Sequence, residues 1–133
     1  MKKFDEEQLE LAIIDLFTKQ DYIHQEGEEL HRKYDEVIIE EDLSSFLSSK
    51  YAELTKTELE KTINKIKHIS TYPLYSSNRQ AFFLINEGFD LSRDDNNKMP
   101  LHIDFIDFET PTNNIFKVVN QITISGTRDR RPD

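Results

Sequence analysis

The sequence has no cysteine, which excludes a disulfide framework and any metal site built on thiolates. It has only three glycines, too few for the glycine-rich loop that cradles a nucleotide phosphate. No apolar run approaches the ~18 residues of a membrane-spanning helix. The N-terminus turns acidic directly after Phe4, where a secretory signal would turn apolar. Together these absences predict a chain that works in the cytoplasm.

Charge is distributed unevenly along the 133 residues, whose net charge is −9. Residues 1–60 hold 17 acidic and 7 basic side chains, whereas residues 61–133 hold 9 and 10. The overall sign disfavours a simple DNA-binding module. The acidic part is typical of a solvated helical surface, and the alternative is a face that avoids DNA or meets another subunit.

Hydrophobic periodicity predicts helices in the first half of the chain. Residues 5–20 carry a broad apolar stripe at helical spacing, which predicts a well-buried helix. The stripe consists of Leu9, Ala12, Ile13, Leu16 and Phe17. Residues 41–51 and 55–69 are also predicted helices, and Thr55 with Glu58 has the spacing of a capping box at the start of the latter.

A shorter helix is predicted after Pro73, because proline ends any continuation of the preceding helix. Ser77 and Gln80 repeat the capping-box spacing and are predicted to open this helix. Gly88 is predicted to close it as a left-handed C-terminal cap.

Alternating apolar residues predict strands over 101–105 and 116–124, and residues 37–39 are a candidate for a shorter one. On the apolar face of the last strand, Asn120 is the polar exception. We expect Asn120 to be hydrogen-bonded and to fix the neighbouring turn, since a buried polar group needs partners. Helices followed by a strand pair predict a single α+β (or α/β) domain over residues 1–133, with helices packed on part of a mixed sheet.

Other polar residues offer weaker candidates. The sequence contains four histidines without metal-ligand spacing, interpreted as structural or surface residues: His24, His31, His68 and His102. An acidic cluster over 104–109 also suggests a metal site, but Asp104 and Asp107 fall on opposite faces of an extended chain. Asn114 is interpreted as a turn residue.

Residues 104–133 contain an ordered series of residues: Ile106-Asp107-Phe108, Pro111, Asn113-Asn114, Phe116, Val119-Asn120-Gln121, Thr123, Gly126 and Arg130-Arg131-Pro132-Asp133. This series resembles the N-terminal region of the restriction (R, or HsdR) subunit of type I restriction-modification enzymes. Ile122 departs from the pattern, which usually has phenylalanine there. A less specific likeness runs back through Asn78-Arg79 and the first helix, so the resemblance covers nearly the whole chain.

The resemblance implies a nuclease domain of the PD-(D/E)xK type, with an incomplete restriction-endonuclease-like core. Asp133 would be the first acid of that motif and a magnesium ligand. The motif's Glu and Lys would lie on the following strand, outside these residues, so this chain alone is expected to be inactive. Glu10, with Glu7 behind it, is the candidate for a further catalytic and metal-binding carboxylate from the first helix. The candidates for contacts to DNA phosphates are Arg128, Arg130 and Arg131.

The resemblance also implies a parent enzyme that cleaves unmodified DNA with magnesium and with ATP, the ATP being bound by a motor region outside this chain. Its partners would be DNA and the methyltransferase and specificity subunits. A strand at 115–125 without its next neighbour predicts self-association through an exposed sheet edge. Two alternatives stay open: a non-catalytic acidic module that binds a protein partner, and a related nuclease outside type I systems.

Overall fold

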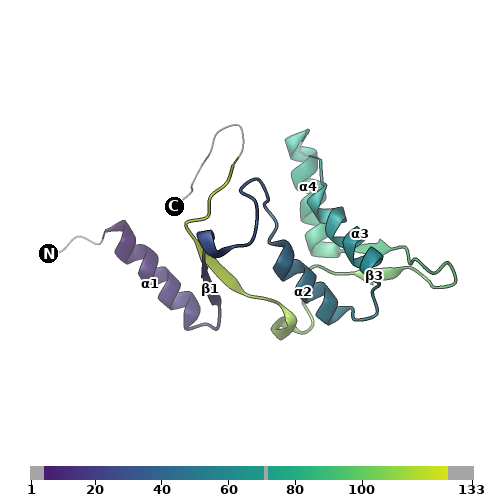
Figure 1. Ribbon diagram of the computed structural model, residues 1–133, viewed down its shortest axis with the longest axis horizontal. Coiled ribbons are helices and arrows are strands. Elements are labelled where there is room, and N and C mark those ends of the chain that lie inside the picture. The colour runs from purple at the N-terminus through teal and green to yellow at the C-terminus, as the bar shows by residue number, and fades with distance from the viewer. Residues whose placement is uncertain (1–4, 71, 126–133) are drawn as a thin grey trace. The chain divides into compact units, whose positions relative to one another are not determined.

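The computed structural model describes residues 5–70 and 72–125. The chain forms two compact units, which we call the terminal unit (residues 1–39 and 115–133) and the central unit (residues 40–114). In sequence, the central unit is therefore inserted between the two parts of the terminal unit. Helices combined with parallel and antiparallel strand pairs confirm the α+β class (Figure 1). The single domain over residues 1–133 stays a prediction.

Helix α1 (Glu6–Thr18) of the terminal unit confirms the helix predicted over 5–20. Its N-cap is Asp5, whose carboxylate accepts a 2.8 Å hydrogen bond from a first-turn N–H. The prediction that this helix is well buried is wrong, because no residue of α1 is buried and Leu9 and Leu16 are 54% and 55% exposed. Within the described residues, the sheet beside it has two strands of four residues each, too small a surface to cover the whole apolar stripe.

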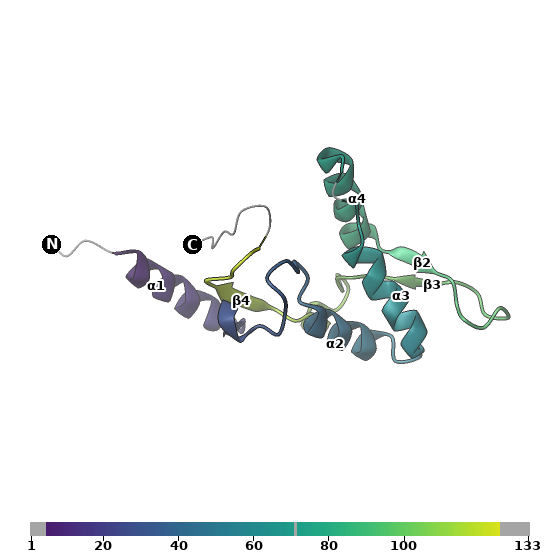
Figure 2. The ribbon, with the colours of Figure 1, turned by 45° about the horizontal axis from the view of Figure 1, so that its top comes forward.

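Strands β1 (Ile23–Glu26) and β4 (Lys117–Asn120) form the parallel sheet of the terminal unit. Helix α1 lies alongside this strand pair in both ribbon views (Figures 1 and 2). The strand predicted over 116–124 is confirmed only for β4. It ends where it does because Gln121 has a left-handed φ of 54°, which interrupts the extended backbone.

Aromatic packing joins α1 to the beginnings of β1 and β4. The ring of Tyr22 lies 5.0 Å from that of Phe17 on α1 and 5.4 Å from that of Phe116, next to β4. A short 3-10 helix, η1 (Gly27–Glu29), follows β1. Residues 37–39, the candidate short strand, form no strand.

The central unit consists of three helices, one strand pair and a 3-10 turn. They are α2 (Glu40–Lys50), α3 (Lys56–Lys67), α4 (Leu74–Glu87), β2 (Phe89–Leu91), β3 (Leu101–Ile103) and η2 (Pro111–Asn113). Figure 2 shows β2 and β3 running side by side. One hydrophobic cluster joins α2, α3 and the strand pair, and its buried members are Phe46, Leu47, Tyr51, Ile63, Leu91 and Ile103.

The capping box predicted from Thr55 and Glu58 is confirmed at the start of α3. Thr55 Oγ accepts from the backbone N–H of Glu58 at 3.1 Å, and the Glu58 carboxylate accepts from the N–H of Thr55. Glu58 is only 1% exposed and also receives a 2.6 Å hydrogen bond from Arg93 Nε. That bond is the main reason why the pKa of Glu58 lies below its ordinary value. The buried carboxylate thus links α3 to the loop after β2.

Helix α4 corrects the second capping-box prediction. It begins at Leu74, with Pro73 as its N-cap residue, so Ser77 and Gln80 lie inside the helix. Ser77 Oγ donates a 3.0 Å hydrogen bond back to the carbonyl of Pro73. Proline fits this position because the first N–H groups of a helix need no intrahelical acceptor, and that preference outweighs the Ser–Gln spacing.

Gly88 ends α4 with a positive φ of 69°, as expected, but with ψ of −159° in place of a left-handed helical value. Strand β2 follows at once and pairs antiparallel with β3, with Phe89 opposite Ile103. The prediction that residues 101–105 and 116–124 form one strand pair is therefore wrong, because β3 pairs with β2 and β4 pairs with β1. A three-residue strand such as β2 is too short to show a clear alternation.

Within the acidic cluster over 104–109, Asp107 organises a loop. The Asp107 carboxylate accepts from the N–H groups of Glu109 and Thr110, at 3.1 and 2.8 Å, and from the side chain of Asn113. Asn114 closes the loop by accepting from the Asp107 N–H and donating to the Asp107 carbonyl, both at 2.8 Å. The hydrogen bond from Thr110, followed by that from Asn113 and by the charge of Lys50, lowers the pKa of Asp107 to about 2.

Replacing Asp107 by Asn is expected to lower the thermal midpoint by several degrees at neutral pH. The folded pKa of about 2 lies below the ordinary 3.8, so the carboxylate stabilises the fold above about pH 4 and loses that contribution as the pH falls towards 2. The variant should therefore show a flatter acid limb in midpoints measured by circular dichroism from pH 7 to pH 2. Glu60→Gln, at an exposed site on α3, is the control. Parallel curves for D107N and wild type would contradict this role.

Candidate functional site

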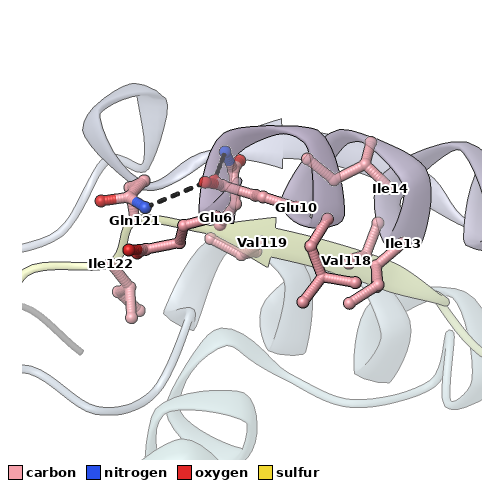
Figure 3. A pocket seen from close by; sticks show the side chains of 10 residues that line it. Glu6, Glu10, Ile13, Ile14, Val118, Val119, Gln121 and Ile122 are labelled. Carbon is pink, nitrogen blue, oxygen red and sulfur yellow. Dashed lines mark hydrogen bonds between the residues drawn. The ribbon is translucent and has the colours of Figure 1, made fainter. Parts of the chain in front are cut away.

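A pocket of about 450 Å³ opens in the terminal unit between α1 and the end of β4 (Figure 3). One face of α1 and the segment 118–122 line it, and the side chains involved are Glu6, Leu9, Glu10, Ile13, Ile14, Val118, Val119, Asn120, Gln121 and Ile122. In the close view, Glu6 and Glu10 point to the Gln121 end of β4, and Ile13 lies near Val118. The pocket therefore has an apolar part and an acidic part.

Of the two acids at the pocket, Glu6 and Glu10, the carboxylate of Glu10 is held by two hydrogen bonds from neighbouring side chains. Its Oε1 accepts a 2.6 Å hydrogen bond from Asn120 Nδ2, and its Oε2 accepts a 3.1 Å hydrogen bond from Gln121 Nε2. Hydrogen bonds to an ionised acceptor are the stronger ones. Both oxygens of the half-buried carboxylate are thereby fixed in one orientation at the pocket.

A backbone kink allows Asn120 and Gln121 to donate to the same carboxylate. In a regular strand, side chains of neighbouring residues point to opposite faces, so Asn120 and Gln121 could not reach the same carboxylate. The left-handed φ of 54° at Gln121 breaks this alternation and brings both carboxamides to Glu10. The expected role of Asn120 in fixing the turn after the strand agrees with this geometry.

Gly27 provides the space for the kinked segment. A Cβ atom on Gly27 would lie 2.7 Å from Ile122 Cα and closer still to the carbonyl oxygen of Gln121. Backbone atoms cannot yield as a flexible side chain can, so any larger residue would push the segment away from β1. The pairing of β1 with β4 thus relies on glycine at this position.

His24 joins the site from β1, a contact that sequence reasoning missed. Its Nε2 lies 2.8 Å from Asn120 Oδ1. In the parallel register, His24 is opposite Val118, so it shares a sheet face with Asn120 two residues further along. With the strand register known, the polar residue at position 24 would have predicted a contact with Asn120.

The donor atoms suit a hard divalent cation. Carboxylate oxygens are the ligands that magnesium prefers, and it binds through one or two carboxylates while keeping several waters. Glu6 and Glu10 line the same pocket, and each Glu10 oxygen keeps a lone pair beyond its hydrogen bond. No group of three or more potential ligands occurs among residues 5–70 and 72–125. These residues therefore fit as part of a magnesium site that needs a further ligand.

The other predicted site residues fare differently. Asp133, Arg128, Arg130 and Arg131 lie outside the described residues. Glu7, named behind Glu10, is exposed and is not among the residues that line the pocket. Of the predicted acids, the structure thus brings Glu10 to the pocket and adds Glu6, which sequence reasoning had not singled out. Helical spacing could have found it, because Glu6 lies four residues before Glu10 on the same face.

The family assignment covers these site residues. The chain matches the model of the family described as type I restriction enzyme R protein N terminus over residues 3–133. It belongs to that family. No curated protein and no solved structure gives a significant match. The matched range contains Glu10, His24 and the Asn120-Gln121 pair as well as Asp133, so the pocket is part of the family's region.

A loop in this R protein N terminus holds the segment that follows β4. Arg32 Nη1 donates to the carbonyls of Lys33 and Glu36, at 2.8 and 2.5 Å, and its Nη2 donates to the carbonyl of Thr123. The N–H of Ser125 donates to the carbonyl of Tyr34 at 2.7 Å. The loop over 32–36 therefore sets the path of the chain over residues 123–125, a role that no sequence pattern predicts. In the described part of the chain, no helix has the length and apolarity that a membrane crossing requires.

Proposed function

We propose that the terminal unit forms part of a magnesium-dependent nuclease site that cleaves DNA within a type I restriction enzyme. Membership of the R protein family supports the parent activity. The observation that carries the proposal is the Glu10 carboxylate, which Asn120 and Gln121 hold at a pocket beside the end of β4. Residues 126–133 follow this strand and include Asp133, the first acid of the motif.

The chemistry to be served is hydrolysis of a phosphodiester. Bound magnesium would acidify a water molecule and neutralise charge that develops on the phosphate. Asp133 and Glu10 would offer it carboxylate oxygens, and Glu6 lines the same pocket. Arg128, Arg130 and Arg131 would contact DNA phosphates, so that DNA affinity falls as salt rises.

The remaining parts of the activity lie with other residues and subunits. These 133 residues hold the first acid of the motif but no following Glu-x-Lys, and one carboxylate of the motif does not complete a site, so we propose that the chain by itself does not cleave DNA. ATP would be used by a motor region of the R protein. Methyltransferase and specificity subunits would be its partners, and the specificity subunit would choose the DNA sequence.

The experiment compares plasmid cleavage by this chain and by a polypeptide extended through the family's Glu-x-Lys strand. With magnesium, the extended polypeptide is expected to nick or linearise the plasmid, and EDTA should stop it. The 133-residue chain is expected to leave the plasmid intact. Cleavage by the short chain would contradict its proposed inactivity. Absence of cleavage by both polypeptides, and also by the complete R protein assembled with ATP and its partner subunits, would contradict the nuclease function.

A second candidate function is a non-catalytic module that binds a protein partner. The observation that favours it is the exposure of three apolar side chains on α1: Leu9, Leu11 and Leu16 are each more than half exposed in an acidic part of the sequence. Strand β4 also pairs with only one strand within the described residues, which supports the expected self-association through its other edge. A stable complex with a methyltransferase subunit, without DNA, would favour the module; a monodisperse monomer in sedimentation velocity would contradict self-association.

A further inference from the structure

We propose that His24 is a positioning residue that acts through Asn120 to hold the Glu10 carboxylate in place for a divalent cation. The proposal rests on the proposed function, in which Glu10 is a ligand. It assigns to β1 a part in the site that otherwise involves α1 and the end of β4. The three side chains form a series, with 2.8 Å between His24 Nε2 and Asn120 Oδ1 and 2.6 Å between Asn120 Nδ2 and Glu10 Oε1.

Hydrogen-bond chemistry fixes the direction of this series. An ionised carboxylate only accepts hydrogen bonds, so Asn120 must turn its NH₂ group to Glu10. Its carbonyl oxygen then faces His24, and a carbonyl oxygen only accepts. His24 must therefore carry a hydrogen on Nε2. The opposite carboxamide orientation would place oxygen against oxygen at Glu10, so the donor state of His24 selects the useful rotamer of Asn120.

Asn120 needs the hydrogen bond from His24 because Gln121, its neighbour in the chain, does not hold the Asn120 carboxamide. Gln121 clamps the other oxygen of Glu10 and leaves the orientation of the Asn120 carboxamide undetermined. The bond from β1 holds the oxygen end of Asn120, so the two carboxamides present their donors to Glu10 together. Partners behind a metal ligand of this kind commonly fix its orientation.

The backbone gives independent support. A positive φ at a residue other than glycine is uncommon and costs free energy, and such residues gather at functional sites. Asp21 and Gln121 are such residues in the described part of the chain, and the kink at Gln121 brings a second donor to Glu10. The close approach of Gly27 to the same backbone places β1, and with it His24, against the kink.

The first test observes the chain without metal. Nitrogen-15 NMR of the histidine rings should show a hydrogen on Nε2 of His24, and the Asn120 side-chain NH₂ should exchange slowly with water. In His24→Leu, which keeps bulk but has no donor, that exchange should become about 10-fold faster or more, while the thermal midpoint stays unchanged. A neutral His24 with its hydrogen on Nδ1, or unchanged exchange at Asn120 in the variant, would overturn the proposal.

The second test titrates manganese(II) alone into the chain and follows line broadening. His24→Leu should raise the apparent Kd about 10-fold or more, and His24→Gln, whose carboxamide can donate, should restore most of the affinity. His68→Leu, at an exposed position in the central unit, is the matched control. If Glu10→Gln weakens binding but His24→Leu does not, the proposal fails while Glu10 remains a ligand. If Glu10→Gln has no effect either, Glu10 is no ligand, and the proposed site fails with the role of His24.

Discussion

Replacing Asp133 by Asn in the polypeptide extended through the Glu-x-Lys strand is expected to lower the rate of magnesium-dependent plasmid cleavage by about 10³-fold or more. Asn keeps the size of the side chain but removes the anionic oxygen that would bind the metal. Metal-ion catalysis contributes several kcal/mol to stabilising the transition state, which is why the expected loss is large. Single-turnover kinetics on supercoiled plasmid, at saturating magnesium, would measure it.

Two further variants make this result specific. Glu10→Gln should also slow cleavage for two reasons. The new side-chain NH₂ group would face the NH₂ group of Asn120 or Gln121, donor against donor, and the neutral amide would be a weaker ligand for the cation. Glu7→Gln, on an exposed part of the same helix turn, is the control and should cleave at the wild-type rate. Retention of wild-type cleavage by D133N would show that Asp133 is not part of the site.

Replacing Gly88 by Ala is expected to reduce the free energy of unfolding by roughly 3 kcal/mol or more. The backbone of Gly88, with φ 69° and ψ −159°, is a conformation that residues with a side chain rarely adopt. A Cβ atom there would also lie 2.9 Å from Asp104 Oδ1 and closer to the carbonyl oxygen of Ile103. Ile103 is fully buried in the core of the central unit, so the backbone there has little freedom to retreat.

Urea denaturation followed by circular dichroism would measure this loss. Ser76→Ala, at an exposed position inside α4, is the matched control and should change the free energy of unfolding by less than about 0.5 kcal/mol. A loss for Gly88→Ala as small as that of the control would mean that the junction of α4 and β2 can relax. The close packing of Gly88 against β3 would then not determine where α4 ends.

Local rules in the sequence predicted part of this fold. The stripe of α1 and the capping box of Thr55 and Glu58 depend on residues three to four apart, and both elements are found where they were predicted. The burial of α1 was wrong because it depends on how much surface the rest of the unit offers. The helix start at Ser77 was wrong because Pro73 provides a competing start within the same turn.

Strand pairing could not be read from local pattern. The partner of β4 is β1, at the other end of the sequence, and β1 is too short for a clear alternation. The contact of His24 with Asn120 could not be predicted either, because it depends on the pairing of β1 with β4. The polar character of Asn120 was visible in the sequence, whereas its two partners, Glu10 and His24, are brought to it by the tertiary fold.

The family motif contributed what periodicity could not. It singled out Asp133 and suggested Glu10 as an acid from the first helix. The structure places Glu10 at a pocket and shows which groups hold it there. The link between these two acids is the step on which the nuclease account depends.

Localising manganese(II) on the extended polypeptide tests this step most directly. Paramagnetic broadening of assigned NMR signals reports which residues lie near the bound ion. We expect the broadening to centre on both Glu10 and Asp133, to include the side chains of Asn120 and Gln121, and to be reversed by magnesium. Broadening at Asp133 that leaves Glu10 unaffected, or broadening confined to other acidic residues, would contradict a shared metal site.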